Sequence, residues 1–335
     1  PAAFSTASAH EFAAYGVALL SAIGVDAVVF GSECGQIEIL KQAAYALNHE
    51  SAEFQERLRK GLKAGLTYPQ ARAKALEMED TWASVLTSPN NILGIEYLRA
   101  AEDLHSPMEF YTISRKGSGY HEDTLADANF PSASAIRGII RNSLSKDKDL
   151  LDILASHLPA VTHPAYTGAV PVFVDDFSEL LNAAVLQMQA TFSIADLSPE
   201  LAARLAKPPY FPLSFEERIQ ALKTRQLTYT RVSRALLHLV LGMREEDISR
   251  WKEEGYALYA RILGFCRQSS PLLSCLHKKS SIPLITKMAD AAQNLSPSAL
   301  ALLEQEVYAS HLYQTVRMKR SGVFQNEYTE GLVFV

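Results

Sequence analysis

Ala27-Val28-Val29-Phe30-Gly31-Ser32-Glu33 is the stretch that decides the fold of this chain. Its four apolar residues, bounded by Gly31, are typical of a buried parallel strand. A helix is predicted before it, because Ser8 and Glu11 have the spacing of a capping box and Gly24 ends the apolar pattern that follows. The order of helix and strand predicts an open α/β sheet. Ligands bind beyond the carboxyl ends of the strands in such sheets, so residues 31–33 lie where a ligand is expected.

A second strand is predicted at residues 109–113, which places Ser114-Arg115 at the same sheet edge as Gly31. Between the two strands, Ser88-Pro89 is a predicted helix start with Ser as the cap and Pro at the first helical position. This helix opens with Asn90-Asn91. Each of these signals has a simpler reading, as a surface pair, turn residues or a loop hinge. The informative observation is that several of them fall on one predicted edge.

Ser132-Ala133-Ser134-Ala135-Ile136-Arg137 has the form Ser-x-Ser-x-x-Arg at another predicted helix start. Unpaired amides and hydroxyls there can bind phosphate oxygens, and Arg137 adds a charged fork one turn into the helix. The alternative is an ordinary Ser-capped helix with a surface arginine. Taken alone, the motif favours that alternative because Ser-rich caps are common.

The chain is long enough for two domains, and we place them at residues 1–160 and 161–335. Residues 36–79 read as helix broken near Asn48, Gly65 and Pro69. Residues 161–174 are rich in Pro, Thr and Gly and read as the domain connection. The rest of the chain is predicted to be mainly helical, with helices at residues 177–191, 199–206, 215–224, 230–242, 245–263 and 296–315. The expected fold is an incomplete Rossmann-like domain followed by an all-helical domain.

Charge is distributed unevenly along the chain. The formal net charge is −5, yet residues 201–280 contain 14 Lys and Arg against 7 Asp and Glu. A polyanion is therefore expected to bind the later domain, where Arg231, Arg234 and His238 share one helix face and Lys278 and Lys279 follow. An ordinary solvent-exposed helix face would also explain such charges. The sequence supports this interpretation and RNA binding about equally.

The sequence lacks the signals of a membrane span, of a disulfide framework and of several common catalytic sites. No apolar run approaches the roughly 18 residues of a membrane span. The three cysteines form no CxxC pair, which fits a reducing cytosol, and the histidines lack ligand spacing. Without a nucleophilic triad, Walker loop or metal cluster, a site of backbone amides, Asn, Ser and Arg indicates catalysis by positioning and charge stabilisation, as in transfer at a nucleotide's phosphorus.

Taken together in order, the motifs resemble the tRNA(Met) cytidine acetate ligase family of the nucleotidyltransferase superfamily. No single motif is specific, but the ordered set spans nearly the whole chain. It comprises residues 4–9 (FSTASA), 30–33 (FGSE), 89–97 (PNNILGIEY), 115–121, 132–137, 175–178 (DDFS), 227–231 (LTYTR), 261–265 (RILGF) and 282–287 (IPLITK).

The resemblance implies ATP-dependent activation of acetate to acetyl-adenylate and acetyl transfer to the wobble cytidine of elongator tRNA(Met). It implies ATP contacts from Gly31, Asn90 or Asn91, and Arg115, with Ser134 and Arg137 matching the superfamily's late phosphate-binding motif. It also implies magnesium with the ATP. The basic residues Arg231, Arg234, Lys278 and Lys279 would then contact tRNA in the later domain.

The family begins with a strand and a loop carrying a His-x-x-His-type motif, and no such segment stands before Pro1. The expected catalytic histidines therefore lie upstream of the residues shown, and the catalytic residues within this chain stay unassigned. Without the first strand, the sheet is expected to expose edges and apolar surface. Two other functions stay open from the sequence: a nucleotidyltransferase acting on a small phosphorylated substrate, and a non-catalytic RNA-binding protein.

Overall fold

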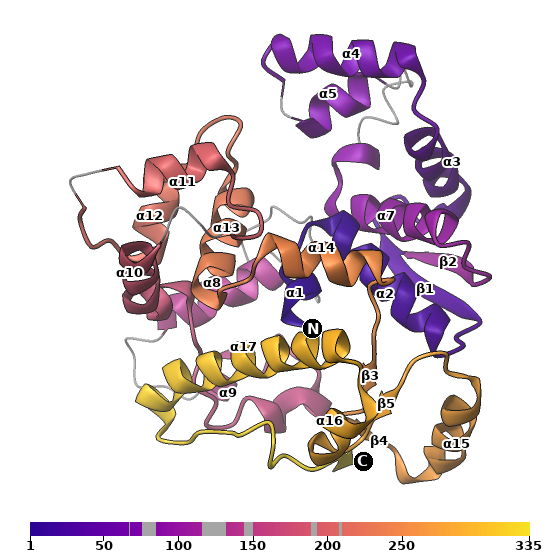
Figure 1. Ribbon diagram of the computed structural model, residues 1–335, viewed down its shortest axis with the longest axis vertical. Helices are drawn as coiled ribbons and strands as arrows, with labels where there is room; N and C mark the ends of the chain where they lie inside the picture. Colours follow the sequence, from indigo (N-terminus) through magenta and orange to yellow (C-terminus); the bar gives the residue numbers. More distant parts are fainter. Residues whose placement is uncertain (67, 76–84, 116–131, 144–149, 189–192, 208–209) are drawn as a thin grey trace.

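The computed structural model describes residues 1–335 except 67, 76–84, 116–131, 144–149, 189–192 and 208–209. In its described part the first half holds α1 (Ala2–Ser5), α2 (Ala9–Ala22), β1 (Ala27–Ser32), α3 (Ile37–Asn48), α4 (Ala52–Lys63), α5 (Tyr68–Ala75), α7 (Pro89–Asp103), β2 (Glu109–Ser114), α8 (Ala133–Ser143) and α9 (Leu150–Leu154). The second half holds α10 (Ser178–Gln187), α11 (Pro199–Leu205), α12 (Phe215–Leu222), α13 (Tyr229–Leu241), α14 (Glu245–Glu253), α15 (Ser270–Lys279), α16 (Ala291–Asn294) and α17 (Pro297–Ser321). Figure 1 shows this helix-rich arrangement.

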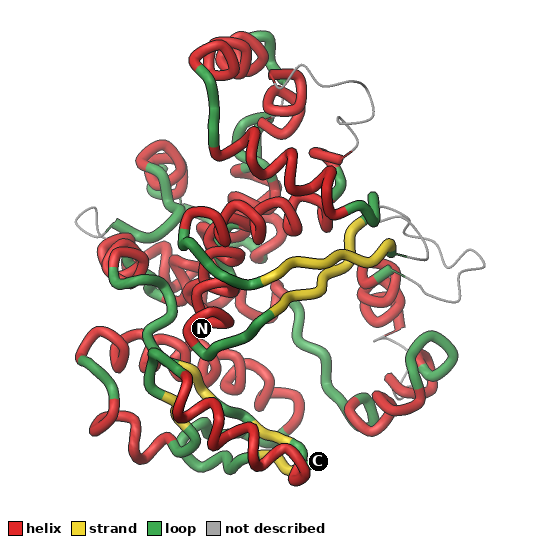
Figure 2. Tube along the Cα trace, turned by 90° about the vertical axis from the view of Figure 1, so that its right-hand side faces the viewer, coloured by secondary structure: helices red, strands yellow, loops and turns green. Residues whose placement is uncertain are grey.

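The predicted parallel sheet is confirmed. β1 and β2 pair in parallel from Ala27 opposite Glu109 to Ser32 opposite Ser114, and they run side by side in Figure 2. The predicted helix starts before them are also confirmed, since Ser8 Oγ accepts a hydrogen bond from Glu11 N and Pro89 is the first residue of α7. The α/β class expected from the sequence is therefore the observed one.

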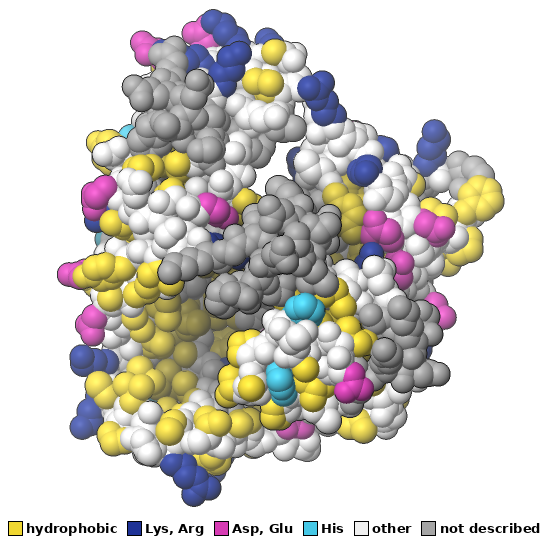
Figure 3. All heavy atoms as spheres, turned by 180° about the vertical axis from the view of Figure 1, so that it is seen from behind, with side chains coloured by type: hydrophobic (Ala, Val, Ile, Leu, Met, Phe, Trp, Pro, Cys, Tyr) yellow, Lys and Arg dark blue, Asp and Glu magenta, His cyan; other side chains and the backbone are white. Residues whose placement is uncertain are grey.

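One face of the sheet is packed and the other is exposed. Val28, Phe30 and Phe110 pack into a core with α2, α3 and α7. On the opposite face Val29, Tyr111 and Ile113 are exposed by 62%, 51% and 63%. Seen from behind, apolar side chains gather around a hollow on the side of the molecule that carries the sheet (Figure 3). Parallel strands are ordinarily covered on both faces, so the expectation of exposed apolar surface is confirmed.

The later half is mainly helical but not entirely so. Two short parallel pairs occur in its described part, β3 (Ala260–Arg261) with β5 (Leu284–Ile285), and β4 (Gly264–Phe265) with β6 (Val333–Phe334). The prediction of helix over residues 245–263 is wrong beyond Glu253. Gly255 and Tyr256 adopt φ angles of 98° and 66°, which end the helix and turn the chain toward β3.

The two halves share a hydrophobic core. Phe4 of α1 is fully buried in a cluster with Trp251, Tyr259 and Leu302, and its ring stacks on Tyr15 at 5.0 Å. We keep the division near residue 160 as a proposal, with α1 packed into the later half. Within the described residues no helix combines the length and apolar character needed to cross a membrane.

Candidate functional site

The carboxyl ends of β1 and β2 bring Gly31 and Arg115 together. The parallel register places Gly31 opposite Ile113, and Arg115 N donates a hydrogen bond of 3.0 Å to the Ser32 carbonyl oxygen. A Cβ at Gly31 would lie 3.3 Å from Arg115 Cγ, so the glycine leaves room for the arginine stem. The predicted meeting of these two loops is therefore present in the structure.

Arg115 is an exposed cation. Among the described residues, no carboxylate forms an ion pair with its guanidinium. Arg115 directly follows β2 and continues the every-second-residue pattern of Tyr111 and Ile113, which places its side chain at the end of the exposed sheet face. A fork-shaped cation in this position can bind phosphate oxygens.

Asn90, Asn91 and Glu33 form a reciprocal clamp between α7 and the loop after β1. Glu33 Oε1 accepts hydrogen bonds from Asn90 N and Nδ2 at 3.2 and 2.6 Å, and Oε2 accepts one from Asn91 N at 2.8 Å. In return Asn91 Oδ1, on a residue only 2% exposed, accepts from Glu33 N and Cys34 N. Partial burial raises the pKa of Glu33, but the hydrogen bonds from Asn90 and Asn91 outweigh it and lower the pKa below its ordinary value.

The clamp changes the interpretation of the α7 N-terminus. Its first amides already bind a carboxylate that belongs to the chain, so Glu33 occupies the place where an anion would bind. Sequence reasoning placed Glu33 at the ligand edge but missed this capping role. Asn91 consequently shapes the loop that follows Gly31, whereas Asn90 is only half-buried and lies nearer the solvent.

Close packing fixes the rest of the edge. Ser32 is fully buried, and its Oγ lies 2.7 Å from Thr112 Oγ1 and accepts from Gly35 N at 3.0 Å. Gly35 has a φ of 63°, and a Cβ there would lie 2.7 Å from Ser114 Cβ. These contacts hold the chain in a tight turn just beyond the strand end.

Ser134 and Arg137 lie in the first turns of α8. Ser132 caps this helix, since its Oγ accepts a hydrogen bond from Ala135 N at 3.0 Å. Arg137 is exposed, and its Nη2 donates to Ser134 Oγ at 3.3 Å. No hydrogen bond or ion pair joins Ser134 or Arg137 to β1 or β2 in the described part of the chain. The structure therefore assembles Gly31, Asn90, Asn91 and Arg115, and among the described residues no hydrogen bond or ion pair joins Ser134 or Arg137 to them.

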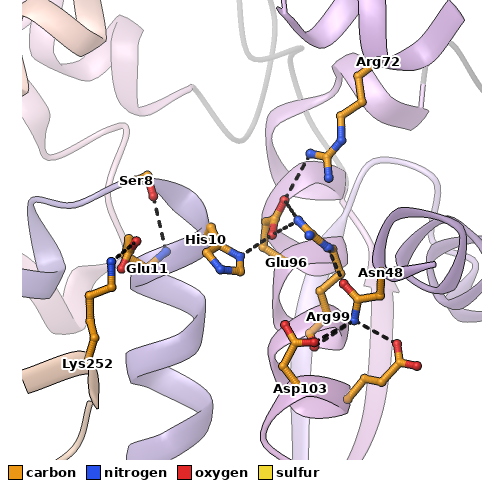
Figure 4. A network of polar contacts seen from close by, with 10 residues as sticks. Ser8, His10, Glu11, Asn48, Arg72, Glu96, Arg99, Asp103 and Lys252 are labelled. Atoms are coloured by element: carbon orange, nitrogen blue, oxygen red, sulfur yellow. Dashed lines mark hydrogen bonds and ion pairs between the residues drawn. The ribbon is translucent and has the colours of Figure 1, made fainter. Parts of the chain in front are cut away.

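A buried carboxylate joins α7 to α2 and α5. Glu96 of α7 is 4% exposed, and Arg99 Nη1 lies 2.7 Å from its Oε2 while His10 Nδ1 lies 3.0 Å from the same atom (Figure 4). Arg72 of α5 approaches Oε1 at 3.5 Å. Burial raises the pKa of Glu96, but the His10 hydrogen bond and the two arginine charges outweigh it, and the pKa lies below its ordinary value.

Sequence reasoning missed this network. The i, i+3 spacing of Glu96 and Arg99 signals a helical ion pair, but not its burial. His10, which the sequence indicated as ordinary, is a partner of Glu96. Among the described residues no group of three or more His, Cys, Asp and Glu is placed to hold a metal ion.

Arg231 and Arg234 of the later domain have different surroundings. Arg234 forms a bidentate pair with Asp196, with Nε and Nη2 donating at 2.8 and 2.7 Å. His238, 1% exposed, approaches the same carboxylate at 3.3 Å and places Nε2 3.0 Å from Thr6 Oγ1. Arg231 is exposed. Of the two arginines predicted to contact RNA, Arg231 therefore has its guanidinium in solvent, while Asp196 binds that of Arg234.

Lys278 and Lys279 are exposed at the end of α15. This helix packs near the start of β1, since a Cβ at Gly24 would lie 3.5 Å from Lys279 Cβ and Ser281 N donates to the Ala22 carbonyl oxygen. α13, which carries Arg231, lies on the opposite side of the molecule in Figure 1. The predicted basic residues thus form two separate patches.

Comparison with known proteins matches this chain to one family. Residues 1–327 match the model of the HIGH Nucleotidyl Transferase family. The tRNA(Met) cytidine acetate ligase of Acetivibrio thermocellus is 32% identical over 350 residues, covering all of this chain and 83% of that protein. The enzyme of the same name from Clostridium novyi is 35% identical over 295 residues, covering 86% of this chain and 73% of that protein.

Solved structures agree with the sequence comparison. Thermotoga maritima TmcAL in its apo form I superposes with a TM-score of 0.86 at 24% identity, covering all of this chain and 84% of that one. A second structure of that protein, bound with alpha-thio ATP, gives a TM-score of 0.83 at 25% identity over 83% of its chain. The shared fold and the level of identity show that this chain belongs to the tRNA(Met) cytidine acetate ligase family of the HIGH nucleotidyl transferases.

Proposed function

We propose that this protein is an ATP-dependent ligase that activates acetate as acetyl-adenylate and acetylates the wobble cytidine of elongator tRNA(Met). The observation that carries the proposal is the sheet edge, where the parallel register holds Gly31 beside Arg115, a cation with no ion-pair partner among the described residues. Relatives that cover nearly the whole chain carry the name of this activity, and one structural neighbour binds an ATP analogue.

ATP fits the groups present at this edge. Gly31 has no side chain to obstruct a nucleotide, and Arg115 offers a cation at the carboxyl end of β2. Asn90 and Asn91 contribute mainly by holding the loop through Glu33, and we assign Asn90 as the one nearer the nucleotide. Ser134 and Arg137 at the start of α8 would add phosphate contacts from a second helix.

The chemistry is a displacement at the α-phosphorus of ATP. An acetate oxygen attacks that phosphorus, the bond to the bridging oxygen breaks, and pyrophosphate leaves with the electron pair. The exocyclic amine of cytidine then attacks the acetyl carbonyl carbon, AMP leaves, and the amine loses a proton. Arg115 and Arg137 would stabilise the charge on the leaving pyrophosphate.

Magnesium would bind mainly to the nucleotide. The described residues offer no cluster of carboxylates for it, and magnesium in nucleotide sites is commonly held by substrate phosphates, water and one or two carboxylates. The ion would neutralise phosphate charge when bound. We also propose a cytoplasmic location, where tRNA and ATP are both available.

For RNA we propose that Arg231, Lys278 and Lys279 contact the backbone directly. Their side chains are exposed, whereas the guanidinium of Arg234 faces Asp196. Arg234 would therefore act by positioning α13 rather than by binding phosphate. Cations fixed on helices suit the electrostatic part of RNA binding.

The test is exchange of labelled pyrophosphate into ATP by the protein expressed from its complete reading frame, with a panel of small carboxylic acids that includes acetate. We expect exchange that requires acetate, followed by acetate transfer to a tRNA(Met) transcript with a cytidine at the wobble position. Exchange with none of the acids would reject the proposed reaction. Transfer to a transcript with uridine at that position would reject the proposed acceptor.

A further inference from the structure

A pocket lies between α11 and α12, on the far side of the molecule from the sheet (Figure 1). Its volume is about 350 Å³, and its described lining includes Arg204, Lys207 and Arg218 together with Tyr210 and Phe211. No acidic residue is among the residues that line it in the described part of the chain. The pocket therefore combines positive charge with aromatic surface.

Arg218 is a buried cation to which no carboxylate of the described residues is paired. The residue is 6% exposed, and its Nη2 donates to Asn182 Oδ1 at 2.7 Å and to the Phe211 carbonyl oxygen at 3.0 Å. Its guanidinium lies 5.5 Å from the centre of the Tyr210 ring. All three partners are uncharged, and the buried Nε has no hydrogen-bond partner among the described residues.

A buried charge without a counter-charge is costly, and an anion in the pocket would supply one. Arg204 at the end of α11 and the exposed Lys207 just beyond it would add two cations at the mouth. The anion best matched by three cations in one pocket is a phosphate group.

Phe211 adds a second kind of contact. Its side chain is 64% exposed, although a phenyl ring is among the groups most readily buried. Exposed aromatic rings beside cations are typical of single-stranded nucleic-acid binding, in which bases stack on the rings and the backbone follows the positive charge. A free inorganic anion would use only the cations and would leave this ring unexplained.

We propose that this pocket binds one unpaired nucleotide of the RNA acceptor, with its phosphate beside Arg204, Lys207 and Arg218 and its base stacked on Phe211. The identity of the RNA rests on the proposed function, but the pocket argument does not. Because the pocket and the sheet edge lie on opposite sides of the molecule, it would hold a part of the tRNA remote from the reacting cytidine.

The test measures binding of a tRNA(Met) transcript over a series of salt concentrations to three variants. These are the double variant Arg204→Ala/Lys207→Ala, the single variant Phe211→Ala, and a control that also removes two exposed cations, Lys41→Ala/Lys60→Ala. The first two change exposed or half-buried side chains, so folding is expected to be retained and is checked by thermal unfolding.

We expect the double variant to bind about tenfold more weakly and to reduce the slope of log K against log salt by about 0.7, because the pocket holds one phosphate and each single-strand phosphate contact contributes about 0.7. Phe211→Ala is expected to weaken binding about tenfold, the size of one lost stacking contact. The control should bind as the wild type does. Wild-type affinity in both pocket variants, or an equal loss in the control, would overturn the proposal.

Two further measurements separate the alternatives. If inorganic phosphate raises the unfolding temperature of the wild type but Phe211→Ala binds RNA normally, the pocket takes a free anion and the proposal is wrong. Acetate-dependent pyrophosphate exchange requires no RNA, so it tests the proposed function independently. If the protein performs the exchange but the pocket variants bind RNA normally, the pocket proposal is wrong and the proposed function stands.

Discussion

The sheet edge and the basic surface of the later helices were both expected to bind substrate, yet they are built differently. At the edge, Gly31, Glu33, Asn91 and Arg115 come from three segments and are held by direct hydrogen bonds and close packing. In the later helices the expected cations are dispersed, and Arg234 is bound by Asp196. The pairing of parallel strands determines which residues become neighbours at the sheet edge. A regional excess of basic residues, in contrast, does not show which of them lack an acidic partner.

The largest effect is expected in the Glu96 network, which joins α7 to α2 and α5. Replacing Glu96 with Ala leaves the largely buried Arg99, whose side chain is 16% exposed, without its carboxylate, and loss of one partner of a buried pair costs about 3 kcal/mol. We expect that decrease in the free energy of unfolding, measured with urea. Glu38→Ala, which removes a carboxylate whose side chain is 73% exposed, is the control and should cost about 0.5 kcal/mol or less.

The same residue predicts a dependence on pH. Because the pKa of folded Glu96 lies below its ordinary value of 4.5, the ionised carboxylate stabilises the folded state above that pH. This contribution is lost as the pH falls through the lower, folded-state pKa. The difference in stability between wild type and Glu96→Gln should therefore shrink below pH 4.5. A difference that stays constant into more acidic solution would contradict the charged assignment.

The next effect tests how closely α7 approaches the sheet. A Cβ at Gly94 would lie 2.3 Å from Phe30 Cε2, so Gly94→Ala must displace either the ring or the helix and should cost about 2 kcal/mol. Gly16 lies within α2 with nothing within 4 Å of its Cβ position. Gly16→Ala should therefore be neutral or stabilise by up to about 1 kcal/mol because alanine favours helix. Equal thermal stability of the two variants would show that α7 does not depend on this close approach.

The smallest expected change in stability comes from replacing the arginines of α13, and it should differ between Arg234 and Arg231. Arg234→Ala removes two charge-assisted hydrogen bonds to Asp196 and should lower the free energy of unfolding by about 1.5 kcal/mol. Arg231→Ala removes an exposed side chain and should change it by less than about 0.5 kcal/mol. Conversely, tRNA binding should weaken mainly in Arg231→Ala. A stable Arg234→Ala variant with the greater loss in RNA affinity would reverse the assignment.

The sequence predicted features that depend on local pattern or on the geometry of parallel strands. Ser8 and Ser88 mark helix starts, and the register of two apolar strands is enough to place Arg115 near Gly31. Residue types at the carboxyl ends of strands therefore indicated the edge correctly, although the ATP contacts themselves stay predictions.

Features that depend on distant partners could not be predicted in this way. Glu96 receives its counter-charges from α2, α5 and α7, and nothing near it in the sequence reveals that it is buried. Asp196 likewise joins Arg234 only in the folded chain. The predicted helix beyond Glu253 failed because pairing of Ala260 with Leu284 requires the turn at Gly255 and Tyr256.

The measurement that tests the central claim most directly is the affinity for ATP of the wild type, Arg115→Ala and Arg59→Ala, by equilibrium titration. Arg115 and Arg59 are both exposed, but only Arg115 lies at the carboxyl end of the sheet. We predict that Arg115→Ala binds ATP about tenfold or more weakly, the loss of one charged hydrogen-bonding group, while Arg59→Ala binds as the wild type does. Unchanged affinity in Arg115→Ala would contradict the assignment of this edge as the ATP site.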